Sequence, residues 1–251
     1  MRLLEHESKR ILATYRISSP KGTLVERGGP DAIGGPVMLK AQIPIGGRGK
    51  TGGILEAKTA EEARTAVSQL LTRVIRGYTP KSVLMEERIS VKQEFFLGIT
   101  YDTVAKAPVA IFSPVGGVDI EELVEREPNR VRKEHFTVRS RLPIYRAREI
   151  VAEAGVTGKL LIGLSSILST MAEVFLDYDA TVVEINPLGL TEDGRLIALD
   201  CHLEIDDDAL FRHADISALE KDAGRVEGER RMSDFERDAA AVDRLDHRGV
   251  A

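Results

Sequence analysis

The chain of 251 residues has a single cysteine, Cys201, and no tryptophan. One cysteine excludes a disulfide scaffold, and it fits a reducing compartment. Aromatic residues make up only 5% of the chain, too few for an aromatic platform that stacks nucleic-acid bases. Basic residues are not in excess, because 35 Lys and Arg stand against 40 Asp and Glu, a net charge of −5. Nucleic acid is therefore not the expected partner, since neutralising its phosphates needs surplus Lys and Arg.

Long hydrophobic runs are also missing. The longest apolar stretch, residues 160–175, is interrupted by small polar residues and is shorter than the ~20 apolar residues that span a membrane. The first residues are charged and lack the apolar core of a signal peptide. We therefore expect no membrane association and a cytoplasmic location, or an organelle matrix if a presequence has been removed. With 43% hydrophobic and 30% charged residues, the chain can form one large domain or two lobes.

Hydrophobic periodicity predicts a mixed α/β first half. An amphipathic helix is expected over residues 3–15, and a second over 59–75, with Thr59 as its N-cap and acidic residues in its first turn. Runs of β-forming residues bounded by glycine and proline predict strands. These are residues 23–25, 36–43, 54–55, 83–87, 92–102 and 108–112.

The second half continues the pattern up to about residue 213. Helices are expected over 146–154 and 159–176, and a buried strand over 179–184 that ends at Asn186. The sequence Thr191-Glu-Asp-Gly194 is typical of a tight hairpin turn, and residues 196–200 form the returning strand. Residues 214–251 are dense in charge and are predicted to be a charged helical tail or linker.

Lys40 is followed by a glycine-rich loop, with five glycines in the eight residues from Gly46 to Gly53. Glycines let backbone N–H groups turn toward an anion, and Arg48 and Lys50 add positive charge. The loop is not a Walker motif, because the residue that would be its first glycine is Pro44. It is either a phosphate-binding loop or a flexible hairpin with incidental basic residues.

A second group comes from the hairpin that follows the long helix. Its two strands bring Asn186 and Asp200 close together, and amide and carboxylate oxygens are ligands that suit Mg²⁺. The alternative is an Asx turn before Pro187 and an aspartate at a strand end. Glu86 and Glu94 flank a connection between two strands, where they could also be plain surface carboxylates. Cys201 and His202 are best explained as a polar pair at a strand end, because no second pair with metal-ligand spacing exists.

Taken in order, several motifs make the chain resemble the ATP-grasp domain of the succinyl-CoA synthetase β-subunit family, which includes malate–CoA ligase and ATP-citrate lyase. Their order and approximate spacing hold from residue 1 to about 213. The motifs are MRLLEH at 1–6, KAQI at 40–43, GGRGKTGG at 46–53, MEE at 85–87, EFFLG at 94–98, SPVGGVDIE at 113–121, GVTGKLL at 155–161, EINPL at 184–188 and DALFR at 208–212.

This resemblance implies an α/β (α+β), two-lobed ATP-grasp fold over residues 1–213, with the small lobe inserted at about 21–100. ATP and Mg²⁺ would be the cofactors. By the matched positions, Lys40 would contact the nucleotide phosphates, and Gly47, Arg48 and Gly49 would cover them. Further roles follow in the same way: Glu86 at the adenine hinge, Glu94 on the ribose hydroxyls, Asn186 and Asp200 on Mg²⁺, and Glu184 facing a phosphohistidine.

The sequence departs from the family at a few places. The segment between Thr23 and Lys40 is shorter, Val115 stands where many relatives have glutamate, and His202 stands where many have lysine. By the resemblance, Val115 and His202 lie near the active site, so these two differences could affect turnover or the choice of substrate. They leave the implied ATP and Mg²⁺ ligands in place.

The resemblance also bears on partners. The family's β-subunit continues into a flavodoxin-like CoA-ligase domain, and its phosphorylated histidine lies on a CoA-binding α-subunit. We therefore expect two separate partners, an α-like chain and a flavodoxin-like domain, and no activity without them. The chain is then a natural split subunit or a truncation. Two other functions stay open: an ATP-grasp carboxylate ligase of another branch, and a non-catalytic nucleotide-binding assembly subunit. The acid that is activated and the choice between ATP and GTP are left open as well.

Overall fold

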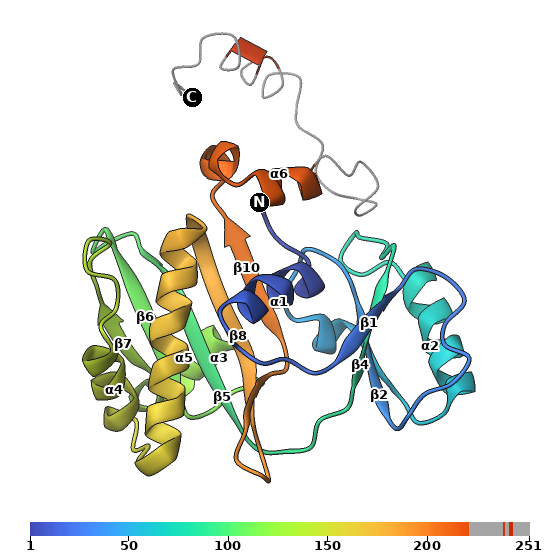
Figure 1. Ribbon diagram of the computed structural model, residues 1–251, viewed down its shortest axis with the longest axis horizontal. Helices are drawn as coiled ribbons and strands as arrows, with labels where there is room; N and C mark the ends of the chain where they lie inside the picture. Colours follow the sequence, from blue (N-terminus) through green and yellow to red (C-terminus); the bar gives the residue numbers. More distant parts are fainter. Residues whose placement is uncertain (221–237, 239–240, 243–251) are drawn as a thin grey trace.

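Two antiparallel sheets lie side by side in the computed structural model, which describes residues 1–220, 238 and 241–242 (Figure 1). A short N-terminal helix, α1 (Glu5–Thr14), lies between them. Most of the predicted charged tail, residues 214–251, falls outside the described residues. Its first part forms helix α6 (Ala214–Glu220).

The smaller sheet has four strands in the order β1-β4-β2-β3. Helix α2 (Ala60–Thr72) covers it and buries Ala63, Val67 and Leu70 against the strands. The predicted N-cap is confirmed, because the Thr59 hydroxyl accepts a hydrogen bond from the Glu62 N–H at 3.2 Å. The strands are β1 (Gly22–Val25), β2 (Val37–Ala41), β3 (Ile54–Ala57) and β4 (Val83–Glu87). A turn of 3-10 helix, η1 (Arg48–Thr51), joins β2 to β3.

The larger sheet has the order β10-β8-β5-β6-β7, with β9 paired to the far part of β8. Helices α4 (Ile144–Glu153) and α5 (Gly158–Asp177) lie against it and share a core with Phe95 and Phe112. The strands are β5 (Val91–Asp102), β6 (Ala107–Ser113), β7 (Arg132–His135), β8 (Ala180–Thr191), β9 (Leu196–Ala198) and β10 (Cys201–Ile205). The remaining elements are α3 (Ile120–Arg126), η2 (Pro128–Arg130) and η3 (Asp207–Arg212).

Helix α5 is the one described helix that is long and apolar enough, by length and composition, to cross a membrane. Its fully buried residues Leu164, Leu168 and Met171 belong to the core of the larger sheet. A core helix of a globular domain passes the same test, so this helix is weak support for a membrane span.

Helix α1 ties the two sheets together through its apolar residues. Leu4, at its N-cap, belongs to the core of the smaller sheet. Leu3, Ile11 and Leu12 belong to the core of the larger sheet. Leu3 also donates its N–H to the carbonyl of Leu203 in β10 at 3.0 Å. The helix is thus held from both sides, and the side chains of its first turn have fixed positions.

Three details differ from the sequence prediction. Strand β8 does not end at Asn186 but continues to Thr191, because Leu188 pairs with Phe95 on one side and Ala198 on the other. Strand β5 lies in the larger sheet, so the smaller sheet ends at Glu87 and does not extend to about residue 100. Strands β7 and β10 were not expected.

Candidate functional site

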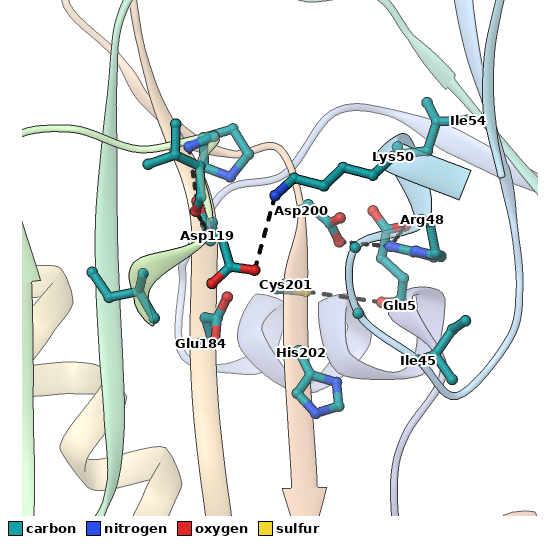
Figure 2. Close-up of a pocket in the computed structure, with 18 of the residues that line it drawn as sticks. Glu5, Ile45, Arg48, Lys50, Ile54, Asp119, Glu184, Asp200, Cys201 and His202 are labelled. Atoms are coloured by element: carbon teal, nitrogen blue, oxygen red, sulfur yellow. Dashed lines mark hydrogen bonds and ion pairs between the residues drawn. The ribbon is translucent and has the colours of Figure 1, made fainter. Parts of the chain in front are cut away.

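A pocket of about 440 Å³ opens between the two sheets. One wall is the glycine-rich loop between β2 and β3, and the other is formed by β8, the start of β10 and the segment before α3 (Figure 2). Of the nine predicted site residues, six line it: Gly47, Arg48, Gly49, Glu184, Asn186 and Asp200. The structure therefore brings together most of two groups that lie far apart in the sequence.

The loop wall is positioned by glycine and by one buried arginine. Gly47 and Gly52 flank η1 with φ of 68° and 72°, a left-handed conformation that favours glycine. The side chain of Arg48 is 4% exposed and donates to Glu5 at 2.6 Å and to Asp200 at 2.7 Å. Burial by itself would lower the pKa of the Arg48 guanidinium. The negative charges of Asp200 and Glu5 outweigh this effect and raise the pKa. A full positive charge is thus held inside the pocket.

Lys50 extends from the same loop toward the opposite wall. Its ammonium lies 3.9 Å from Asp119 and 3.6 Å from Glu122, as Figure 2 shows for Asp119. The lysine side chain is 64% exposed, so solvent and salt weaken both pairs. This contact closes the pocket loosely at its rim.

On the sheet wall, Asn186 and Asp200 are held next to each other. The Asn186 N–H donates to the Asp200 carbonyl at 3.0 Å. The Asn186 side chain is oriented by the loop before α3, since its Oδ1 accepts from the Gly117 N–H at 2.8 Å and its Nδ2 donates to the Val118 carbonyl at 3.0 Å. Glycine suits position 117, because the backbone there has a φ of 72°, a left-handed conformation that favours glycine.

Glu184 and His202 face each other across the pair β8 and β10. Burial raises the pKa of Glu184, while His202 and a hydrogen bond with Asn186 act in the opposite direction. Next to His202, the Cys201 thiol is buried and lies 3.9 Å from the Glu5 carbonyl, to which it donates. Burial also raises the pKa of this thiol. Cys201 is thus unsuited to act as a nucleophile, because the reactive form is the thiolate.

Three predicted residues do not line the pocket. Lys40 and Glu86 are buried beside it and form an ion pair of 2.9 Å with each other. Glu94, on β5, accepts a hydrogen bond from the Gly116 N–H at its backbone carbonyl at 2.9 Å. Of the two family departures near the site, His202 lines the pocket and Val115 does not.

The sequence reasoning missed Glu5, which lines the pocket from α1. It is fully buried and forms ion pairs with residues 35 and 43 positions away, Lys40 at 2.8 Å and Arg48 at 2.6 Å. No local pattern carries this information. The motif at the start of the chain is the only signal that could have drawn attention to it. Asp119 and Glu121, also on the pocket wall, were part of a matched motif but were given no role.

The residues of this pocket suit a magnesium ion better than a transition metal. No three His, Cys, Asp or Glu side chains gather as metal ligands within residues 1–220, 238 and 241–242. Asn186 and Asp200 offer two adjacent oxygen donors, and Mg²⁺ characteristically takes one or two protein oxygens and completes its shell with water and phosphate. The donor set therefore fits Mg²⁺ brought in with a phosphate ligand.

The family model of the ATP-grasp domain matches residues 2–190. The chain belongs to the ATP-grasp family. The ATP-grasp family predicted from the motifs is thereby confirmed, together with its two-lobed α/β fold. Among curated proteins, the chain is 38% identical over 240 residues to the "Succinate--CoA ligase [ADP-forming] subunit beta" of Natronomonas pharaonis. The alignment covers 94% of this chain and 63% of that protein, so this ATP-grasp chain spans about three fifths of that relative's length.

Solved structures share the fold. A dinucleotide-forming acetyl-coenzyme A synthetase of Ca. Korarchaeum cryptofilum has a TM-score of 0.66 at 21% identity, covering 82% of this chain and 93% of that one. ATP citrate lyase from Methanothrix soehngenii has a TM-score of 0.65 at 21% identity, covering 97% of this chain and 60% of that one. At this level of identity the likeness shows the fold alone.

Proposed function

We propose that this ATP-grasp chain is the nucleotide-binding part of an ADP-forming acid–CoA ligase of the succinate–CoA ligase β-subunit type. The reaction would convert ATP, a carboxylate and CoA to acyl-CoA, ADP and phosphate, through an acyl phosphate and a phosphohistidine. One observation carries the proposal. A basic glycine-rich loop faces Asn186, Asp200 and Glu184 across a single pocket, in a chain 38% identical to a succinate–CoA ligase β subunit.

The loop wall has the charge and the backbone that phosphate groups require. Phosphoryl transfer depends on positioning and on cations at the phosphate oxygens. Arg48 supplies a buried cation and Lys40 a second one beside the pocket. Gly47 and Gly49 flank Arg48, and glycines let backbone N–H groups turn toward an anion. In this proposal the loop from Gly47 to Gly49 covers the phosphates.

The sheet wall would hold the metal and the histidine that accepts the phosphoryl group. Asn186 and Asp200 would bind Mg²⁺, which supplies charge neutralisation at the phosphate oxygens. Glu184, as a carboxylate, would orient the imidazole of the incoming histidine and stabilise its cationic form. Glu86 at the adenine and Glu94 at the ribose complete the assignment, and these two rest on their positions in the matched motifs.

The proposal includes partners, because the histidine and the CoA site are not assigned to this chain. We propose a CoA-binding α-like chain that carries the phosphorylated histidine, and a flavodoxin-like CoA-ligase domain. Residues 1–213 would form the ATP-grasp domain and 214–251 a linker or docking tail. Activity would require the partners, and the assembly would work in the cytoplasm.

Calorimetric titration of the purified chain with Mg-ADP, Mg-GDP and CoA tests this function. We expect nucleotide binding that disappears when EDTA removes Mg²⁺, and no CoA binding. The comparison of the affinities for Mg-ADP and Mg-GDP shows whether the chain prefers adenine or guanine. A folded chain that binds neither nucleotide would overturn the proposal, and a chain that binds nucleotide but transfers no phosphoryl group would favour a non-catalytic assembly subunit. Phosphoryl transfer from ATP directly to a carboxylate, with no histidine partner present, would favour an ATP-grasp ligase of another branch.

A further inference from the structure

Glu5, on the helix between the two sheets, is the carboxylate that contacts three cations beside the pocket. Its Oε1 lies 2.8 Å from the Lys40 ammonium and 2.6 Å from the Lys9 ammonium. Its Oε2 lies 2.6 Å from Arg48 NH2. Lys40 is on β2, Arg48 on η1 and Lys9 one turn along α1. One carboxylate therefore contacts three cations from three elements.

These contacts belong to a larger set, the intersheet charge cluster. Three more pairs complete it: Glu86 to Lys9 at 2.6 Å, Glu86 to Lys40 at 2.9 Å and Asp200 to Arg48 at 2.7 Å. The cluster thus contains three cations and three carboxylates, so its charges balance. Its members are Glu5, Lys9, Lys40, Arg48, Glu86 and Asp200.

Buried charges tolerate little imbalance, because an unpaired one is far from water. Burial by itself would raise the pKa of Glu5, but Arg48, Lys40 and Lys9 outweigh it and hold that pKa well below its usual range. Glu5 is therefore ionised, and its side chain is 1% exposed. It contacts Lys40 and Arg48, the two cations assigned to phosphate, and it is not itself suited to contact a phosphate, because like charges repel.

We propose that Glu5 is a positioning residue, which holds Lys40 and Arg48 in place for the nucleotide phosphates. The inference rests on the proposed function. Arg48 is shared between Glu5 and Asp200, and Asp200 is the proposed magnesium ligand. When Asp200 turns to a metal ion, Glu5 remains as the partner of Arg48. The guanidinium then stays in the pocket, free to donate to phosphate oxygens.

The position of Glu5 on α1 suits this role. The helix is anchored in both cores by its apolar residues, and the Leu4 N–H donates to Glu7 Oε2 at 2.7 Å, which fixes the first turn. The loop that carries Arg48 has glycines on both sides and contacts the larger sheet through Asp200. A rigid helix therefore supplies the anchor that the glycine-rich loop lacks.

The test is a double variant that removes the carboxylate and keeps the cluster neutral, Glu5→Gln with Lys9→Gln. The single change Glu5→Gln leaves a surplus buried cation and can prevent folding. The double variant leaves two cations, Lys40 and Arg48, against Glu86 and Asp200. We expect its dissociation constant for Mg-ADP, by calorimetry, to rise by about tenfold or more, because charge-assisted hydrogen bonds that hold the phosphate ligands are lost.

A matched control separates positioning from stability. Asp177→Asn removes another carboxylate, at the end of α5, which ties α5 to the end of α1. Asp177 accepts from the Tyr15 hydroxyl at 3.0 Å and pairs with Arg141 at 2.8 Å, and none of the three residues lines the pocket. This variant should lower the thermal unfolding midpoint and leave Mg-ADP affinity unchanged. Glu5→Asp keeps the charge but is one methylene too short to reach both cations, so it should fold and still bind Mg-ADP several-fold more weakly.

The outcomes are distinguishable. Wild-type chain that fails to bind Mg-ADP would overturn the proposed function and this inference with it. A second outcome is that the wild type binds Mg-ADP, and that Glu5→Asp and the folded double variant bind it with the same affinity. That result would overturn this inference and leave the proposed function standing. Weaker binding in Glu5→Asp at an unchanged unfolding midpoint would support it even if the double variant does not fold.

Discussion

The two walls of the pocket are built in opposite ways. The sheet wall carries Asn186 on strand β8 and Asp200 just before strand β10, joined by a backbone hydrogen bond. The loop wall is a glycine-rich connection whose cation, Arg48, is held mainly by ion pairs. One wall has fixed oxygen donors, and the other has cations whose positions depend on their partners. A ligand that changes those partners, such as a metal-bound nucleotide, can move the loop wall without disturbing the sheet wall.

The largest expected effect is on the sheet wall. Glu184→Gln should leave Mg-ADP binding within about twofold and lower phosphoryl transfer to the partner histidine by about 10²- to 10⁴-fold, the range of a lost acid–base group. The measurement is transfer of ³²P from labelled ATP to a CoA-binding partner chain. Transfer at the wild-type rate would remove the proposed role of Glu184.

Asp200→Ala tests the metal site on the same wall. We expect Mg-dependent nucleotide affinity to fall by about 100-fold or more, because a metal ion at phosphate contributes several kcal/mol. Circular dichroism should show that the fold survives, because Arg48 keeps its ion pair with Glu5 and the Asp200 side chain is 28% exposed to solvent. The matched control is Asp193→Asn at the tip of the same hairpin, where Asp193 pairs with Arg195 at 2.7 Å, and its nucleotide affinity should equal that of the wild type. An unchanged affinity in Asp200→Ala would refute the metal assignment.

Arg48→Gln tests the loop wall and should produce two changes of opposite sign. Mg-ADP affinity should fall by about tenfold, since a charge-assisted hydrogen bond is lost. Binding of Mn²⁺ alone, followed by electron paramagnetic resonance, should become tighter, because Arg48 no longer competes for the Asp200 carboxylate. Mn²⁺ binding that weakens in this variant would contradict the idea that Arg48 and the metal share Asp200.

The smallest effect is expected on the outer side of the smaller sheet. Thr59→Ala removes the N-cap of α2 and should lower the free energy of unfolding by about 1 kcal/mol, as measured by urea denaturation. Mg-ADP affinity should not change, since α2 lies on the far side of that sheet from the pocket. A large loss of affinity would mean that the loop wall depends on the whole sheet and not on its ion pairs.

Much of the fold could be predicted from the sequence, because it depends on local patterns. Some signals lie within a few neighbouring residues. Examples are the N-cap at Thr59, the turn that ends at Gly194 and the hydrophobic periodicity of α5. Strand β7 could not be predicted, since Arg132-Lys-Glu-His135 has no apolar alternation and gains its strand form from pairing with β6. Strand β10 was missed although Cys201, Leu203 and Ile205 alternate as buried residues, so here the signal existed.

The candidate site also has one part that the sequence predicted and one part that it did not. The chemistry of Arg48, Asn186 and Asp200 could be proposed from their motifs, and the structure places them at one pocket. The role of Glu5 could not, because its partners Lys40 and Arg48 lie 35 and 43 residues away. Ion pairs between distant elements leave no periodic pattern. They become visible only when the two sheets are placed around α1.

The balance of the intersheet charge cluster has a consequence for protein engineering. The glycine-rich loop looks like a portable module, since it is a short connection between two strands. Transplanted alone into another scaffold, however, it would bring Arg48 without Glu5 and bury an unmatched cation. The smallest transferable unit is therefore the loop together with α1, two segments separated in the chain. When segments are exchanged between related proteins, the glycine-rich loop and α1 should therefore be exchanged together.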